Sequence, residues 1–186
     1  MNTHYLDLLN ELQISNKDAT TLVETGTHRG AGAEAWGSIF EKVHTIELSD
    51  SLYKYCLNTY DLSNVNFIHG ASTDVLEELV DNIKEPYVLF LDAHGSGGDT
   101  TYDEATGRFG SPVLEELEAV KSNPPTCIII DDLRCFDDPS LNYPNRDQII
   151  NKIQDVGDYG EPIVCNLNLP GNPSHNQPQW YCFKLR

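Results

Sequence analysis

Three acidic residues that follow two apolar segments of the chain carry the clearest chemistry. Asp92 comes directly after YVLFL, and Asp131 and Asp132 come directly after TCIII. If these segments are neighbouring strands, the carboxylates converge and repel each other unless a cation neutralises them. Carboxylate oxygens suit Mg²⁺, Mn²⁺ or Ca²⁺ better than zinc. We therefore predict a divalent-metal site at Asp92, Asp131 and Asp132; the alternative for the aspartate pair is a simple cap of the following turn.

His94 is the residue best placed to act as a base beside these acids. It lies two residues after Asp92, and imidazole titrates near neutral pH. A protonated alcohol is a poor nucleophile, whereas a bound divalent cation lowers the pKa of the hydroxyl and orients it. A general base then takes the proton. We predict His94 and Asp92 as catalytic residues; the alternative is that His94 only hydrogen-bonds the glycine-rich segment that follows.

A glycine-containing turn and one glutamate indicate a nucleoside site. The turn Glu24-Thr-Gly26-Thr-His-Arg-Gly30 joins an apolar strand to a helix, where glycines let backbone N–H groups approach a ligand near the helix N-terminus. The spacing differs from the dinucleotide pattern GxGxxG, so the main sequence evidence for an NAD site is missing. Glu47 ends the next strand, where an acid accepts hydrogen bonds from ribose hydroxyls. Together they predict an adenosine-containing ligand; alone, each is also typical of a plain turn or a solvent-facing acid.

A parallel sheet would bring these side chains together. Short apolar runs alternate with helical patterns, and the runs are too continuously apolar for one face to contact water. Such sheets bind ligands outside the carboxyl ends of their strands, where these polar residues lie. We predict strands at 21–26, 43–48, 65–70, 87–92 and 126–132, helices at 31–40, 51–60, from about 72, from about 112 and at 146–156, and an antiparallel pair within 161–169 and 178–186.

Composition narrows the class of partner. The 186 residues fit one domain, and 39% hydrophobic residues suffice for a core. A formal net charge of −17 argues against nucleic acid and anionic membranes as partners. No stretch reaches the roughly 20 apolar residues of a membrane helix, and the first residues lack the pattern of a secretory signal. Five cysteines without a CxxC pair indicate reduced thiols, so we expect a cytoplasmic protein.

The order of these motifs resembles a known family, the class I S-adenosylmethionine-dependent methyltransferases. The matching features are an acidic glycine turn, an acid after the second strand, a small-residue turn after the third and an acid after the fourth: Glu24-x-Gly26-x-x-x-Gly30, Glu47, Gly70-Ala71-Ser72 and Asp92. The resemblance covers residues 21–132, and the terminal antiparallel pair is similar to the family's last two strands. It implies an α/β fold with a Rossmann-like, doubly wound, mostly parallel seven-stranded sheet and helices on both faces.

The resemblance also implies which residues contact the cofactor. The turn would surround the methionine part, the glutamate after the second strand would hold the ribose, and the small residues after the third strand would lie near the adenine. The residues implied to bind S-adenosylmethionine are Glu24, Thr25, Gly26, Thr27, Gly30, Glu47, Leu48, Ala71, Ser72 and Asp92.

The acid triad resembles that of small metal-dependent O-methyltransferases, including those that act on sugar hydroxyls. In these enzymes, acids after the fourth and fifth strands hold Mg²⁺ or Mn²⁺ against vicinal hydroxyls. We predict a saccharide acceptor, of a glycan or a glycosylated metabolite. Only residues 1–20 precede the first strand, and catechol-type enzymes usually have a longer segment there, so the cleft is expected to be more open to a large glycan. The alternatives are a catechol-type or other small-molecule methyltransferase, a non-catalytic cofactor- or metal-binding domain, and a metal-dependent hydrolase or hydroxylase.

The expected organisation is a single domain over 1–186, with a helical cover at 1–20, the cofactor and metal core at 21–132, and a helix with the terminal strands at 133–186. It is either complete or one module of a larger glycan-modifying protein. The glycine-rich loop 95–110 is a candidate lid over the substrate, in which Tyr102 could stack on a sugar and Asp99, Asp103 or Glu104 could accept hydroxyls. The alternative, which we favour for any single one of these residues, is a solvated acidic loop. Arg29 and Arg134 are candidates for the cofactor carboxylate or a substrate anion.

Overall fold

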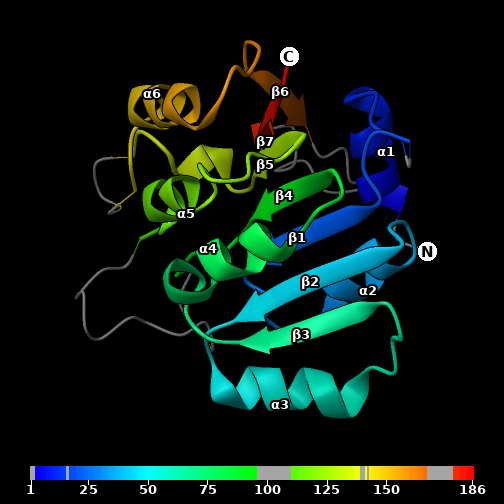
Figure 1. Cartoon of the computed structure of the whole chain (residues 1–186). Coiled ribbons are helices and arrows are strands. Elements are labelled where there is room, and N and C mark those ends of the chain that lie inside the picture. Colours follow the sequence, from blue (N-terminus) through cyan, green and yellow to red (C-terminus); the bar gives the residue numbers. More distant parts are fainter. Residues whose placement is uncertain (1–2, 16, 96–109, 139–140, 142, 167–177) are drawn as a thin grey trace.

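One seven-stranded sheet organises the chain. The computed structural model describes residues 3–15, 17–95, 110–138, 141, 143–166 and 178–186 (Figure 1). The strand order is β3-β2-β1-β4-β5-β7-β6. The first five strands pair in parallel, β7 is antiparallel to β5, and β6 is antiparallel to β7. The strands are β1 Thr21–Thr25, β2 Lys42–Glu47, β3 Val65–His69, β4 Tyr87–Leu91, β5 Cys127–Ile130, β6 Ile163–Asn166 and β7 Pro178–Lys184.

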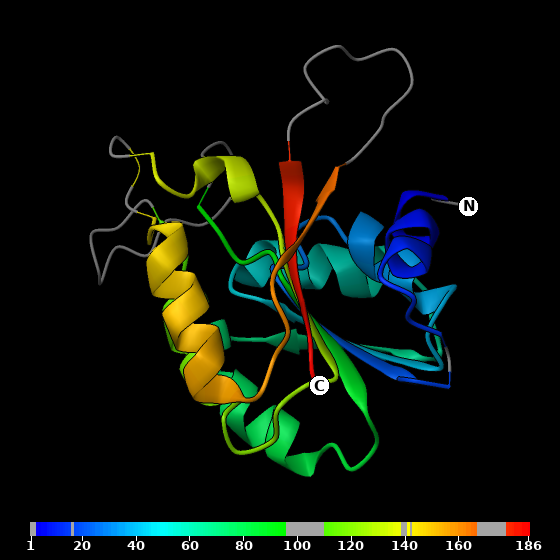
Figure 2. The ribbon, with the colours of Figure 1, turned by 90° about the horizontal axis from the view of Figure 1, so that it is seen from above.

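Helices cover both faces of the sheet. Figure 2 shows α6 on one side and α1 on the other. The apolar face of α4, α5 and α6 packs on one face of the strands, while α1 and α2 pack on the opposite face. Burial of one aliphatic side chain in such a layer contributes about 1.5–3 kcal/mol. The helices are α1 Thr3–Glu11, α2 Ala31–Gly37, α3 Asp50–Thr59, α4 Ser72–Asn82, α5 Val113–Ala119 and α6 Arg146–Val156, with a 3-10 turn η1 at Leu133–Cys135.

The strand register aligns the ends of the three central strands. Thr25 of β1 pairs with Leu91 of β4, which pairs with Ile130 of β5. The residues that come next, Gly26, Asp92 and Asp131, therefore leave the sheet at the same level. All residues of β1, β4 and β5 are buried, which fixes this register because a slip of one residue would exchange the two faces.

The predicted fold is confirmed, including the parallel core and the terminal antiparallel pair. Three details differ. The third strand is only half-buried because it forms an edge of the sheet, and the fifth strand ends at Ile130 rather than at 132. The helix predicted at 31–40 ends at Gly37. Asp132 has a left-handed backbone with φ 57°, which turns the chain out of the sheet. None of the described helices combines the length and apolar composition that a membrane-spanning helix needs.

Candidate functional site

A cavity of about 1000 Å³ lies at the carboxyl ends of the parallel strands. This is where an open α/β sheet binds its ligands. Of the predicted cofactor residues, six line it: Gly26, Glu47, Leu48, Ala71, Ser72 and Asp92. The predicted catalytic and metal residues His94, Asp131 and Asp132 line the same cavity. The structure therefore brings both predicted groups to one site, with the remaining four, Glu24, Thr25, Thr27 and Gly30, outside the cavity wall.

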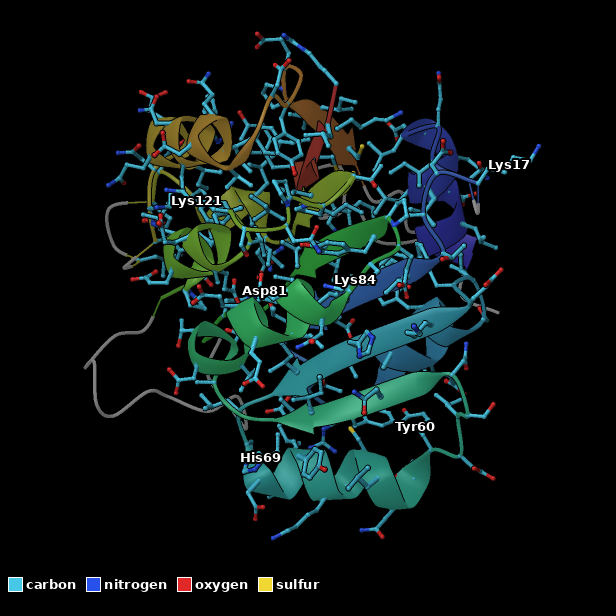
Figure 3. The ribbon with its side chains drawn as sticks, viewed as in Figure 1. Lys17, Tyr60, His69, Asp81, Lys84 and Lys121 are labelled. Atoms are coloured by element: carbon cyan, nitrogen blue, oxygen red, sulfur yellow. The ribbon has the colours of Figure 1, made fainter. Side chains whose placement is uncertain are left out.

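Glycine is required at two positions of the turn after β1. Gly26 has φ +85°, and a Cβ there would lie 2.4 Å from the carbonyl oxygen of Asp92. Gly30 has φ +81°, and its Cβ would lie 2.5 Å from the ring of Tyr60. Tyr60, which is labelled in Figure 3, also donates its hydroxyl to the Arg29 carbonyl at 3.0 Å. Gly26 thus lets the turn approach Asp92 at the cavity, whereas Gly30 packs the start of α2 against the chain after α3.

Glu47 is anchored by two backbone donors. The N–H of His28 donates to its Oε2 at 2.7 Å, and the N–H of Ser49 donates to its Oε1 at 2.8 Å. The residue is 6% exposed and lines the cavity. Each carboxylate oxygen has a second lone pair for a further donor. Glu47 therefore ties the glycine turn to the end of β2 and can still accept hydroxyls from a ligand.

Glu24 lies behind the cavity wall. It is 2% exposed, and the Thr45 hydroxyl donates to its Oε2 at 2.6 Å. Thr27 and Thr45 share a further hydrogen bond of 2.6 Å. Burial raises the pKa of Glu24 to about 8, although the Thr45 hydrogen bond opposes the shift. Glu24, with Thr27, therefore supports the glycine turn from below, and Thr25 is fully buried at the end of β1.

The ring of His94 lies between two aspartates. Its Nδ1 is 3.1 Å from Asp92 Oδ1, and its Nε2 is 2.5 Å from Asp132 Oδ2. The guanidinium of Arg134 pairs with the other oxygen of Asp132. Burial opposes the charge of His94, but its contacts with Asp132 and Asp92 outweigh this effect and raise the pKa to about 10. The two aspartates therefore favour the protonated form of His94, and its role as a base stays a prediction.

The three acids share an edge of the sheet without forming a set of metal ligands. Asp92 pairs with His94, although burial raises the pKa of this aspartate, and both oxygens of Asp132 already face cationic side chains. Within the described residues, no group of three or more His, Cys, Asp or Glu side chains has the arrangement of a metal site. Because His94 and Arg134 pair with Asp132, the three acids as placed do not fit a divalent ion.

The far end of the cavity is formed by residues that the sequence analysis did not single out for binding. Tyr143, Pro144 and Gln148, from the start of α6 and the segment before it, line the cavity with Arg134. The Tyr143 ring is 6.3 Å from that of His94, with 54° between their planes, and Phe136 supports it edge-on at 5.4 Å. The only sequence signal was an aromatic residue before a proline at a helix start. Asp99, Tyr102, Asp103 and Glu104 lie outside the described residues.

Comparison with known proteins supports the fold. No family model and no curated protein sequence matches the chain. Solved structures do. An S-adenosylmethionine-dependent methyltransferase from Anabaena variabilis is 10% identical, with a TM-score of 0.62, over 98% of this chain and 83% of that one. The O-methyltransferase TomG from Streptomyces achromogenes, solved with S-adenosylmethionine, is 15% identical, with a TM-score of 0.59, over 98% and 78%.

A third similar structure is the N-methyltransferase NodS from Bradyrhizobium japonicum, 11% identical with a TM-score of 0.57, over 99% of this chain and 97% of that one. The chain has the class I methyltransferase fold. The strand order 3-2-1-4-5-7-6 with an antiparallel seventh strand is the feature that decides this. Because TomG and NodS methylate different kinds of atom according to their names, the class I methyltransferase fold alone does not specify the acceptor.

Proposed function

We propose that this protein is an S-adenosylmethionine-dependent O-methyltransferase. The observation that carries the proposal is a single cavity that joins a nucleoside-type half to a proton-binding half. The first half contains Gly26, Glu47 and Ser72, and the second contains Asp92 and His94. An O-methyltransferase needs both halves. The methyl group must pass directly from the cofactor to an acceptor held beside it, and the acceptor hydroxyl must lose its proton.

The cofactor half would bind S-adenosylmethionine through its backbone turn and one acid. Glu47 is held by two N–H donors and accepts the ribose hydroxyls. Ala71 and Ser72 lie at the start of α4 and face the adenine. Gly26 and Asp92 both line the cavity, where the methionine part would lie beside the turn after β1. The sulfonium is positive, so the carboxylate of Asp92 favours its binding.

The transfer step moves a methyl group from sulfur to oxygen. The acceptor oxygen forms the new C–O bond as the C–S bond breaks, and the sulfur leaves with that electron pair as the neutral thioether of S-adenosylhomocysteine. The acceptor hydroxyl gives its proton to the Asp92–His94–Asp132 group. A bound sulfonium lowers the pKa of His94 by like-charge repulsion, which favours the neutral imidazole that takes this proton.

Metal assistance does not fit the proton-binding half as its residues are placed. His94 and Arg134 already meet the charge of Asp132, so a divalent ion would have to displace side chains that the structure pairs. We therefore derive no step through Mg²⁺ or Mn²⁺, and the proton-binding group is built from this chain's own residues.

A saccharide is the acceptor that best suits the far end of the cavity. A sugar ring presents C–H groups to an aromatic face and hydroxyls to polar groups around it. Tyr143 offers the ring. The Oε1 of Gln148 accepts the Asn145 N–H at 2.9 Å, which holds the amide of Gln148 in one orientation at the cavity. The cytoplasmic location and a place within a larger glycan-modifying protein stay predictions.

Methyl transfer from isotope-labelled S-adenosylmethionine to a panel of mono- and disaccharides tests the acceptor class. We expect labelled methyl ether on at least one sugar, with KM raised about tenfold in Tyr143→Ala and little changed in Tyr143→Phe, which keeps the stacking face. Tyr55→Ala is the matched control, because Tyr55 is exposed on α3 and does not line the cavity. Transfer to catechols or amines but to no sugar would contradict the saccharide assignment.

A further inference from the structure

A glutamate is buried under the floor of the cavity where an apolar residue would be expected. Glu116 lies on the inner face of α5 beside the fully buried Val113 and Leu117, and it is only 1% exposed. Within the part of the chain that the structure describes, its Oε1 has no hydrogen-bond partner. Burial of an incompletely paired carboxyl reduces stability, so its presence calls for an explanation beyond packing.

Glu116 lies beside two hydroxyls that belong to the cavity floor. The hydroxyls of Ser72 and Thr25 hydrogen-bond to the Glu116 carboxyl, and these hydrogen bonds lower its pKa. Ser72 is the first residue of α4 and lines the cavity. Thr25 ends β1, and its hydroxyl accepts the backbone N–H of Asp92 at 3.3 Å. The Glu116 carboxyl is thus linked, directly or through Thr25, to three parts of the chain that meet at the cofactor half. These are the end of β1, the start of α4 and Asp92 after β4.

The charge state of Glu116 is balanced near neutrality. Burial raises the pKa to about 7; the Ser72 and Thr25 hydroxyls oppose this shift, and the negative charges of Glu115 on α5 and Asp92 after β4 add to it. Asp92 is itself paired with His94. The N-terminus of α4 at Ser72 favours the ionised form. A positive ligand in the cavity would favour it further.

We propose that Glu116 is a positioning residue for the cofactor, holding the Ser72 and Thr25 hydroxyls under the cavity and favouring a positively charged ligand when ionised. This role rests on the proposed function, because it requires S-adenosylmethionine in the cavity. Ionised Glu116 distinguishes the sulfonium of S-adenosylmethionine from the neutral thioether of S-adenosylhomocysteine. The product is therefore held less tightly than the substrate, which assists its release.

Calorimetric titration with both ligands at pH 6 and pH 8 tests this role. In the wild type we expect the affinity for S-adenosylmethionine, relative to S-adenosylhomocysteine, to rise about threefold to tenfold between these pH values. Glu116→Gln keeps the shape but cannot ionise, so most of this pH-dependent preference is lost while the affinity at pH 6 is nearly retained. The remainder reports Glu24, the other buried acid behind the cavity, whose pKa is about 8. Glu116→Leu removes the hydrogen bonds and weakens binding about tenfold at both pH values.

Glu118→Gln is the matched control. Glu118 lies on the same helix, is exposed and pairs with Lys121 and Lys152, so the variant should behave as the wild type. If Glu116→Leu does not fold, the pH profile of Glu116→Gln still decides. An unchanged preference in Glu116→Gln would overturn the role of Glu116. Failure of the wild type to bind either ligand would instead contradict the proposed function, and the role of Glu116 with it.

Discussion

The two halves of the cavity differ in the chemical groups that form them. The cofactor half depends on the backbone: Gly26 permits a close approach between β1 and the chain after β4, and Glu47 is fixed by two N–H groups. The proton-binding half depends on charged side chains, with His94 between Asp92 and Asp132. The first half is set once the strands pair, whereas the second can be rearranged by a ligand or a proton.

This difference separates binding from chemistry. In the cofactor half, backbone groups present fixed dipoles to the bound cofactor. The aspartate–histidine group instead stores and moves a proton, and its state depends on the charges around it. Changes in one half should therefore alter cofactor affinity, and changes in the other should alter turnover.

The largest effect is expected from removal of the imidazole. His94→Ala eliminates the group that links Asp92 to Asp132, and we expect turnover to fall about 100- to 1000-fold. Affinity for S-adenosylmethionine should be retained or slightly strengthened, because a positive charge leaves the cavity. Steady-state kinetics and calorimetry measure the two quantities. The control is His69→Ala. His69, which is labelled beside α3 in Figure 3, stacks on Tyr53 and does not line the cavity. Equal losses in both variants would contradict the assignment.

The next effect concerns the buried support behind the cofactor half. The pKa of Glu24 is about 8 in the folded protein and about 4.3 when unfolded. Between these values the folded state binds more protons, so its contribution to the free energy of unfolding falls as pH rises, by on the order of 3–5 kcal/mol, and levels off above pH 8. Glu24→Gln should remove this slope. Urea denaturation at several pH values measures it, and an unchanged slope would show that Glu24 is ionised at neutral pH.

A smaller effect is expected at the glycine turn. Gly26→Ala places a Cβ against the Asp92 carbonyl at a positive φ, and we expect a loss of about 1–3 kcal/mol in the free energy of unfolding together with weaker cofactor binding. Gly160→Ala is the control, since its Cβ would meet no atom closer than 3.8 Å. If the two variants are equally stable and bind equally well, the backbone does not fix the cofactor half in this way.

The smallest effect is expected from metal removal. Because His94 and Arg134 meet the charge of Asp132, exhaustive chelation should change turnover by less than about twofold. The measurement compares chelated protein with protein resupplied with Mg²⁺ or Mn²⁺. Loss of activity on chelation and its recovery with either ion would restore the metal site predicted from Asp92, Asp131 and Asp132, and would show that His94 moves aside.

Most of the fold and the location of the site could be predicted from the sequence, because apolar runs define strands and polar residues at their ends must share one edge. Glu47, Asp92 and Asp132 were found in this way. The pairing within the site could not be predicted, since it depends on side-chain orientation and on the left-handed backbone of Asp132.

Two functional candidates left almost no signal in the sequence. Glu116 lies between the apolar positions of α5, where a helical pattern with Glu115 and Glu118 suggests a solvent-facing residue. Only the packing of α4 on α5 and on the end of β1 shows that this carboxyl is buried. Tyr143 belongs to an irregular segment whose place at the cavity is set by the turn after Asp132 and the start of α6.

Calorimetric titration of S-adenosylmethionine into the wild type and Glu47→Gln tests the central claim most directly. We predict micromolar binding to the wild type and at least about tenfold weaker binding to the variant, because an amide cannot accept both the His28 and Ser49 N–H groups while also receiving the ribose hydroxyls. Exposed Glu41→Gln should bind as the wild type. No binding to the wild type, or equal binding to Glu47→Gln, would contradict the assignment of this cavity as a cofactor site.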